Sequence, residues 1–438
     1  MLKHFEKYLD NKLPFLKKSK VLIAISGGID STVLTFLTHG LKMDCTLAHC
    51  NFKLRASESD LDEIFVKKLG VFLNIPTITT SFDTQKYASE NGISTQMAAR
   101  DLRYNWFKKL LKEKEIDYVL TAHHKEDVLE TFLINFTRGT GLDGLLGIPE
   151  INGAIIRPLL NFTREDISKY AKKNKIEWRE DKSNQSTKYL RNKIRHTVIP
   201  ILKELNPNLL KTFEKTQKNL HESHLLIDEY IGTLKKEILS QDKDGNTKIS
   251  INKIKSLKHP KAHLYELLKP YGFKSWKDIT SLIKAQTGKQ LFSKSHRLIK
   301  NREEFLLSKI NDGSKDINII PIDIKSIDSP IQLTFKEVDL NEVFNSYSAY
   351  IDKNLLNNTL VLRKWEKGDY FYPIGMKGKK KLSKFFKDEK LSLLEKENTW
   401  LLCSGNEIVW VIGKRLDNRY KITKKTKSIL KITYKNNV

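Results

Sequence analysis

Short apolar runs alternate with longer helical patterns over roughly the first 200 residues. The runs place apolar side chains at consecutive positions, which is typical of parallel strands buried on both faces. They predict strands at 21–26, 45–50, 77–81 and 118–122, with helices at 30–41, 57–73, 94–114 and 126–137. This alternation predicts an α/β domain whose parallel sheet is covered on both faces. The strand-to-helix loops of such a sheet meet at one edge, where ligands bind.

The pattern changes after residue 200. Apolar spacing from 208 to about 239 predicts one long amphipathic helix that leaves the first domain. Residues 290–308 are typical of strands with a turn near Asn301, and 400–403 with 408–412 predict a hairpin. We therefore expect an α/β domain at 1–215, a mainly helical domain at 216–310, a linker region at 311–346 and a small α+β domain at 347–438.

The first predicted strand ends in the turn Ser26-Gly27-Gly28-Ile29-Asp30-Ser31, and a helical pattern follows. Glycine lets a backbone approach a ligand without an intervening Cβ and permits positive φ. The N–H groups and dipole at the start of the next helix favour an anion there. Asp30 would repel a bare phosphate, so it fits beside a cation such as Mg²⁺ or beside backbone donors. No Gly-Lys-Ser/Thr follows, so the turn is a phosphate cradle of a type other than Walker A.

The charge balance is strongly basic, with 78 Lys and Arg against 52 Asp and Glu and a formal net charge of +26. Such a balance favours a polyanionic partner such as nucleic acid. An AT-rich genome, which enriches lysine and asparagine at protein surfaces, would also produce it. Charge alone therefore supports nucleic-acid binding only modestly.

No apolar run is long enough to span a bilayer, and the first residues lack the apolar core of a signal peptide. We therefore expect a cytoplasmic protein without a membrane partner. The chain has 3 cysteines and no CxxC pair. This opposes a disulfide framework, a zinc ribbon and an iron–sulfur cluster.

Further motifs accompany the glycine turn in a fixed order. They are His49-Cys50-Asn51-Phe52-Lys53-Leu54-Arg55, Ala98-Ala99-Arg100-x-x-Arg103-Tyr104, the run 121–131 (TAHHKEDVLET) and Arg138-Gly139-Thr140-Gly141-Leu142-x-Gly144-Leu145. Together with the turn, they resemble the tRNA(Ile)-lysidine synthase family of PP-loop ATP pyrophosphatases. Later motifs that fit the same family are Arg157-Pro158-Leu159, Asp181-x-Ser183-Asn184, Arg191-Asn192-x-x-Arg195 and Arg363…Gly368-Asp369…Pro373…Gly375. One departure is Glu126, which stands where the family usually has aspartate.

The resemblance implies a ligase reaction on RNA. ATP would adenylate the C2 oxygen of the wobble cytidine in the CAU anticodon of tRNA(Ile). L-lysine would then displace AMP through its side-chain amine, and the codon read would change from AUG to AUA. The α/β domain would be the PP-loop catalytic domain, and the later domains would bind the tRNA. A homodimer is a further expectation, because dimers are common in the family.

The resemblance also assigns residues. ATP would bind the turn residues Ser26, Gly27, Gly28, Ile29, Asp30 and Ser31, with Mg²⁺ at Asp30. Asp127 and Glu130 lie three apart on one face of a helix, which suits them to hold the amine of lysine. Arg103 is the candidate for stabilising negative charge during adenylation, so the expected catalytic set is Asp30, Arg103, Asp127 and Glu130. The candidate tRNA contacts are Arg100, Arg191, Arg195, Lys379 and Lys380.

Rival hypotheses remain beside this interpretation. A PP-loop enzyme that adds sulfur to cytidine would usually need paired cysteines or a cluster, whereas Cys45 and Cys50 bracket a buried strand and Cys403 is distant in sequence. A glutamine-dependent amidotransferase would usually need a cysteine at the extreme N-terminus, where Leu2 stands instead. A non-catalytic RNA-binding protein would have no need for the intact turn.

Overall fold

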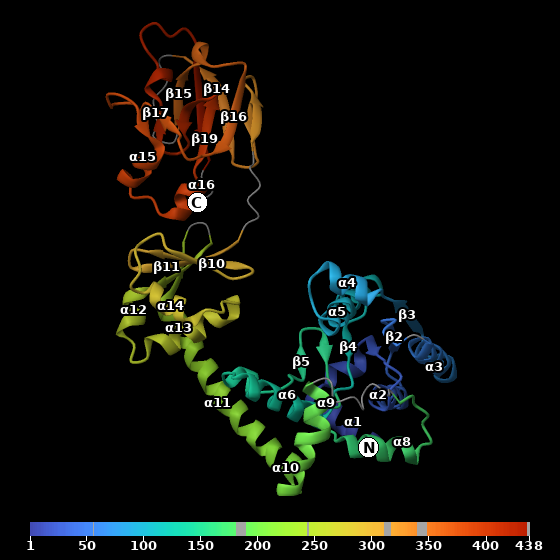
Figure 1. Cartoon of the computed structure of the whole chain (residues 1–438). Coiled ribbons are helices and arrows are strands. Elements are labelled where there is room, and N and C mark those ends of the chain that lie inside the picture. The colour runs from blue at the N-terminus through green and yellow to red at the C-terminus, as the bar shows by residue number, and fades with distance from the viewer. Residues whose placement is uncertain (56, 181–189, 243–244, 311–316, 340–347, 436–438) are drawn as a thin grey trace. The chain divides into compact units, whose positions relative to one another are not determined.

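The structure is a computed structural model, and it describes the whole chain except residues 56, 181–189, 243–244, 311–316, 340–347 and 436–438. The chain divides into two compact units, Met1–Asp228 and Glu229–Val438 (Figure 1). The motif Asp181-x-Ser183-Asn184 lies outside the described residues.

The first unit is built on a six-stranded sheet with the order β3-β2-β1-β4-β6-β5. Its neighbours pair in parallel except β5, which pairs antiparallel with β6. The strands are β1 Val21–Ala24, β2 Cys45–Asn51, β3 Thr77–Ser81, β4 Tyr118–Leu120, β5 Ile151–Asn152 and β6 Ile155–Ile156. The predicted parallel α/β domain is therefore confirmed, and the carboxyl ends of β1, β2, β4 and β6 share one edge.

Helices follow the strands at the predicted places. The helices of this unit are α1 Leu2–Lys12, α2 Ile29–Gly40, α3 Ser57–Leu73, α4 Thr84–Glu90, α5 Thr95–Glu113, α6 Lys125–Arg138, α7 Leu142–Leu145, α8 Arg164–Lys173, α9 Leu190–Lys193, the π-helical turn Ile194–Val198, α10 Ile199–Leu205 and α11 Leu209–Ile238, which continues into the second unit. The capping box of α8, between Thr163 and Asp166, fixes its first turn.

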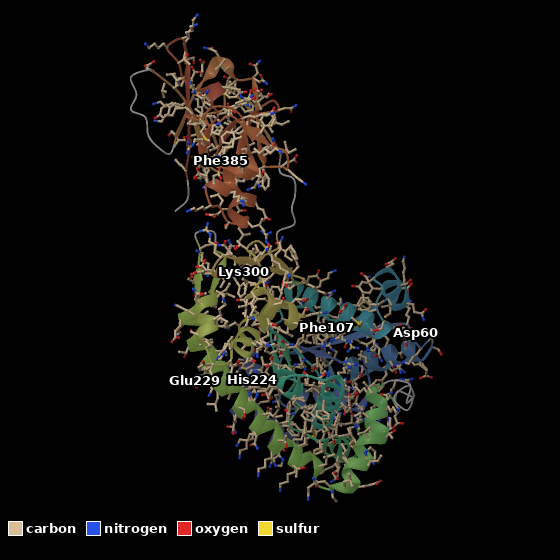
Figure 2. The ribbon with its side chains drawn as sticks, turned by 60° about the vertical axis from the view of Figure 1, so that its left-hand side comes forward. Asp60, Phe107, His224, Glu229, Lys300 and Phe385 are labelled. Atoms are coloured by element: carbon tan, nitrogen blue, oxygen red, sulfur yellow. The ribbon has the colours of Figure 1, made fainter. Side chains whose placement is uncertain are left out.

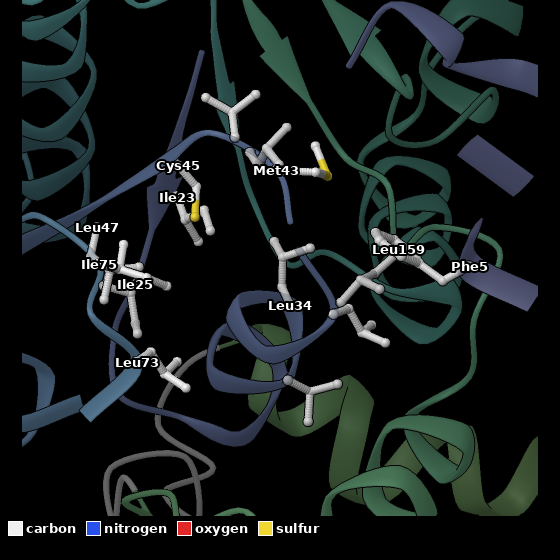
Figure 3. Close-up of a cluster of buried hydrophobic side chains, with 14 of the residues drawn as sticks. Phe5, Ile23, Ile25, Leu34, Met43, Cys45, Leu47, Leu73, Ile75 and Leu159 are labelled. Atoms are coloured by element: carbon white, nitrogen blue, oxygen red, sulfur yellow. The ribbon is translucent and has the colours of Figure 1, made fainter. Parts of the chain in front are cut away.

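Both faces of the sheet carry an apolar core. Ile23 and Leu47 pack with Leu34 of α2 on one face (Figure 3). The neighbouring residue Leu22 packs with Phe107 of α5 on the other face, and Figure 2 labels Phe107 in this unit. Successive strand residues point to opposite faces, so burial on both sides explains why the strands are continuous apolar runs.

The prediction that residues 216–310 are mainly helical is wrong. The region holds a five-stranded sheet with the order β7-β8-β11-β10-β9, whose paired strands run antiparallel. Its strands are β7 Leu239–Gln241, β8 Thr247–Ser250, β9 Gln290–Phe292, β10 His296–Asn301 and β11 Glu304–Lys309, with helices α12 Ile251–Ser256, α13 Pro260–Leu268 and α14 Trp276–Leu282. The short strands β7 and β8 carry polar side chains such as Ser240 and Lys248, so no apolar run marks them in the sequence.

Two further antiparallel sheets form the C-terminal region, in the orders β12-β16-β19-β20-β21 and β13-β14-β22-β15. Residues of both sheets, such as Leu402 and Ile432, share one core. The elements are β12 Asn318–Pro321, β13 Ser326–Ile327, β14 Leu333–Val338, β15 Ser348–Asp352, β16 Thr359–Lys364, β17 Tyr370–Phe371, β18 Lys380–Lys381, α15 Leu382–Asp388, α16 Leu393–Asn398, β19 Trp400–Ser404, β20 Glu407–Val411, β21 Arg415–Leu416 and β22 Ile429–Tyr434.

Two sequence predictions meet the structure in this region. The hairpin is confirmed as β19 and β20. By contrast, the segment 311–346 that we expected as a linker carries β12, β13 and β14 of these sheets. Phe385 and Phe386 of α15 are 2% and 0% exposed and belong to the core of this region (Figure 2). Among the helices that the structure describes, none is both long and apolar enough to cross a membrane.

Close packing at Gly70 of α3 gives a test of this fold. A Cβ at this position would overlap Thr77 Oγ1 and lie 3.1 Å from both Thr77 Cβ and Ile75 O. Threonine is stiff at χ1, so the site cannot relax freely. We expect Gly70→Ala to lower the free energy of unfolding by about 1–3 kcal/mol, visible as a lower thermal midpoint by circular dichroism.

Gly232 of α11 is the matched control, because a Cβ there meets nothing within 4 Å. Gly232→Ala should leave stability unchanged or raise it by up to about 1 kcal/mol through helix propensity. An unchanged midpoint for Gly70→Ala would contradict the packing of α3 against the strand β3.

Candidate active site

The serine hydroxyl groups of the glycine turn form hydrogen bonds with the backbone of the same turn. Ser31 Oγ donates to Gly28 O at 3.0 Å and accepts from Ser26 N at 3.2 Å, while Gly28 N donates to Ser26 Oγ at 3.3 Å. Gly27 has a φ of +89°. Helix α2 begins at Ile29 with no side chain capping it. The first N–H groups of α2 are therefore available to an anion at the carboxyl end of β1.

A second set of contacts links the turn to helix α3, and the sequence analysis did not predict it. Arg179 N donates to Gly27 O at 2.9 Å. The guanidinium group of Arg179 binds Asp62 at 2.5 Å and Glu58 at 2.7 Å on α3. Arg55 binds the other oxygen of Asp62 at 2.7 Å. The turn is thus anchored to α3 through one buried carboxylate, and no local pattern in the sequence could reveal a partner 117 residues away.

Asp30 stands in the first turn of α2 with its two oxygens in different surroundings. Oδ2 pairs with the guanidinium group of Arg164 and lies 4.0 Å from His124 Nε2. Oδ1 is buried and has no hydrogen-bond partner among the described residues. One carboxylate with a free oxygen fits Mg²⁺, which usually takes one or two carboxylates and completes its shell with phosphates and water. The described residues contain no cluster of three or more metal-ligating side chains, so such an ion would need the phosphates.

The neighbouring strand β4 leads into a network around His124, the N-cap residue of α6. Its backbone N–H donates to Asp127 Oδ2 at 3.0 Å, and its Nδ1 lies 3.0 Å from Glu126 Oε2. Burial lowers the pKa of His124, but the carboxylates of Glu126, Asp127 and Asp30 outweigh burial and raise it above its ordinary value. Glu126 Oε2 also accepts from Arg164 N at 3.0 Å. The residue that departs from the family pattern therefore holds His124 and the start of α8 together.

The two acids of α6 face an arginine rather than open solvent. Glu130 is 0% exposed, and Arg195 clamps it with contacts of 2.5 Å and 2.9 Å. Arg195 also reaches Asp127 Oδ1 at 3.2 Å, and Arg191 lies 3.1 Å from Glu130. Asp127 and Glu130 do share one face of the helix, as their spacing predicted. Arg191 and Arg195, which we expected at the tRNA, pair with these acids in the structure.

The pKa of the adjacent histidine, His123, shifts in the opposite direction. Its Nδ1 lies 3.0 Å from Thr121 Oγ1, and burial lowers its pKa to about 4. His123 is therefore neutral at pH 7 although it follows the same strand as His124. The sequence, which shows only a double histidine, could not distinguish the two.

Helix α5 brings Arg100 and Arg103 to the same face of the sheet as Phe107. The guanidinium carbon of Arg103 lies 5.2 Å from the centre of the Phe52 ring, which follows β2. Arg100 lies 4.8 Å from the ring centre of Tyr104 on its own helix. Both arginines are exposed, so their charges remain accessible to a ligand.

The thiols are poor nucleophiles. Burial raises the pKa of Cys45 to about 11, of Cys50 to about 12 and of Cys403 to about 11. Reactive cysteines need a lowered pKa, so these side chains do not suit sulfur transfer.

The candidate tRNA lysines lie in the second unit and differ from each other. Lys379 Nζ lies 5.2 Å from the ring centre of Tyr370, which is 48% exposed. Lys380 Nζ pairs with Asp388 Oδ2 at 2.7 Å, and its side chain is 16% exposed. The two lysines therefore present different amounts of free charge at the surface.

Comparison with known proteins finds family matches in both units of the chain. Residues 1–202 match the PP-loop domain family, residues 241–310 match the TilS substrate binding domain and residues 360–432 match the TilS substrate C-terminal domain. A tRNA(Ile)-lysidine synthase from Bacteroides thetaiotaomicron is 39% identical over 430 residues, which cover 97% of each chain. Another from Parabacteroides distasonis is 38% identical over 420 residues, covering 94% of this chain and 95% of the relative.

A more distant tRNA(Ile)-lysidine synthase, from Clostridium tetani, is 31% identical over 454 residues that cover 95% of this chain and 94% of the relative. The similarity thus extends over both units. The chain belongs to the tRNA(Ile)-lysidine synthase family.

Proposed function

We propose that this chain is a tRNA(Ile)-lysidine synthase that uses ATP to activate the C2 oxygen of the wobble cytidine in a CAU anticodon. The side-chain amine of L-lysine then attacks C2 and displaces AMP, after pyrophosphate has left in the first step. One observation carries the proposal. The bare turn after β1, with the free oxygen of Asp30 beside it, shares a sheet edge with the acids of α6.

The turn is suited to the phosphates of ATP. The N–H groups of Ile29, Asp30 and Ser31 lie at the start of α2, where the helix dipole favours negative charge. These donors need no reorganisation as negative charge develops on the leaving pyrophosphate. A Mg²⁺ ion held by Asp30 and the phosphates would neutralise part of that charge. Arg103, which is exposed on α5, is proposed to stabilise charge at the phosphate that is attacked.

The acids of α6 are suited to the amino groups of lysine. Asp127 is partly accessible, whereas Glu130 is fully buried and acts through its clamp on Arg195. Arg195 thereby gains a fixed orientation and a second role, since its remaining donors can hold the carboxylate of an amino acid. The attacking amine must lose its proton, so its pKa must fall from a reference of roughly 10.4. The buried surroundings of the acids favour that loss.

Substitution of Asp30 tests the cradle. Asp30→Asn keeps the shape of the side chain but removes the charge that we assign to the metal and the phosphates. We expect AMP release in the presence of tRNA(Ile), ATP and lysine to fall by about 100-fold or more, the scale seen when one preorganised group is lost. Binding of tRNA, measured by filter retention, should stay within about twofold.

Glu165→Gln is the matched control for this experiment, because Glu165 is an exposed acid that pairs with Lys169 on α8. It should retain wild-type AMP release. Normal turnover by Asp30→Asn would contradict the assignment of the cradle.

Substitution of Asp127 tests the lysine site. Asp127→Asn can still accept the N–H of His124 but cannot pair with an ammonium group. A charge-assisted hydrogen bond contributes about 1.5–3 kcal/mol, so we expect the KM for lysine to rise by about 10-fold or more while the KM for ATP changes less than about twofold. Steady-state kinetics with each substrate varied in turn measures both constants. A rise in the KM for ATP alone would place the amine elsewhere.

The lysines of the C-terminal region test the tRNA surface. Lys379 has no acidic partner in the described contacts, whereas Lys380 is paired with Asp388. We expect Lys379→Gln to weaken tRNA binding and to reduce the slope of log K against log salt by about 1, as for the loss of one phosphate contact. Lys380→Gln should have a smaller effect. If instead only the KM for lysine moved, the assignment of this surface to tRNA would be wrong.

A further inference from the structure

Arg157 is a buried cation without a carboxylate partner among the described residues. Arg157 is the residue directly after β6, and it is 4% exposed. One terminal nitrogen donates to Pro149 O at 2.6 Å, and the Tyr104 hydroxyl contacts the guanidinium group. Nε is buried with no partner among those residues. Burial of a charge without an opposite charge costs several kcal/mol, so the guanidinium group is poised for an anion.

The fold directs this arginine to the functional edge of the sheet. Ile156 O accepts from Thr121 N at 3.0 Å, so Arg157 leaves the sheet beside the segment that carries His123. Ile155 packs with Phe107 on the α5 face and Ile156 packs on the opposite face. Because successive residues of a strand point to opposite faces, Arg157 lies on the same face as Ile155. This is the α5 face, in agreement with the contact of Arg157 to Tyr104.

A second cation lies at the same place. Arg100 sits over the ring of Tyr104 at 4.8 Å and is exposed. Burial lowers the pKa of Arg157, and the nearby charge of Arg100 lowers it further. Arg100 and Arg157 both contact Tyr104, so their guanidinium groups repel each other, and an anion bound between them would relieve that repulsion.

We propose that Arg157, Tyr104 and Arg100 form a subsite for a backbone phosphodiester of the tRNA, next to the wobble nucleotide. This inference rests on the proposed function. The planar fork of a guanidinium group matches two phosphate oxygens, and the phenol adds a neutral donor. The strand order places β4 between β1 and β6, so the subsite is two strand spacings, about 10 Å, from the cradle for the phosphates of ATP. The acids of α6 are proposed to serve the amine of lysine, which leaves the RNA backbone beside the wobble nucleotide as the anion still without a site.

A double-mutant cycle on the full chain tests the subsite. The probe is the anticodon stem-loop of the tRNA with a neutral methylphosphonate in place of either phosphodiester that flanks the wobble cytidine. With the wild-type protein, one of the two replacements should raise the Kd by about 10-fold. With Arg157→Lys or Arg100→Gln, the unmodified stem-loop should already bind about 10-fold more weakly, and the same methylphosphonate should add little.

Two further variants serve as controls for this experiment. Tyr104→Phe removes only the hydroxyl donor and should weaken the same phosphate contact by a smaller factor. Lys112→Gln removes an exposed charge from the same helix and should behave as wild type. If Arg157→Lys fails to fold by circular dichroism, Arg100→Gln and Tyr104→Phe carry the test, because Arg100 is exposed and phenylalanine keeps the ring of Tyr104.

The outcomes separate this inference from the proposed function. Fully additive effects of the protein and phosphate changes would overturn the subsite. So would variants that raise the KM for lysine or for ATP and leave the Kd for the stem-loop unchanged, since the anion would then be a carboxylate or a nucleotide phosphate. Lysine-dependent AMP release by the wild-type protein would stand in either case, and only its absence would refute the proposed function.

Discussion

The active edge of this protein depends on a single backbone constraint, the positive φ of Gly27. At +89°, this residue adopts a conformation that side-chain-bearing residues rarely reach, and it allows β1 to pass into α2 through a tight turn. A Cβ there would also approach the Phe65 ring at 3.4 Å. Because the turn is short, the first N–H groups of α2 and the carboxylate of Asp30 arrive at the same edge as the end of β4. Arg179 holds the turn in this form through Gly27 O.

The acids at this edge are neutralised by arginines from distant parts of the chain. Arg164 pairs with Asp30, and Arg195 pairs with both Asp127 and Glu130. A buried carboxylate without such a partner would destabilise the fold by several kcal/mol. The pairing also sets how ligands enter. A cation that approaches Asp30 Oδ2 must compete with Arg164, whereas Oδ1 has no partner among the described residues and accepts a ligand without competition.

The sequence predicted the elements of the first unit well and their long-range contacts poorly, for a physical reason. A strand such as β2 is buried on both faces, so its apolar run is visible without knowledge of its neighbours. The strand β8 is too polar to be recognised as an apolar run. Its stability comes from pairing with β7 and β11, which the local sequence pattern does not show. The long-range contacts of the site were likewise not visible in the sequence. The spacing of Asp127 and Glu130 revealed their common face, but their partner Arg195 is 65 residues beyond Glu130 and had suggested RNA binding.

The order of the strands also orders the charges of the site. The end of β1 presents backbone donors, the end of β4 presents acids around His124, whose pKa they raise, and the end of β6 presents Arg157. The phosphates, the amine and the RNA backbone that we propose to bind at these three strand ends would carry complementary charges in that same order. Arg157 has no carboxylate partner among the described residues, so the end of β6 keeps a positive charge that is not compensated there. The strand order therefore sets the order in which the three proposed substrates would lie along this edge.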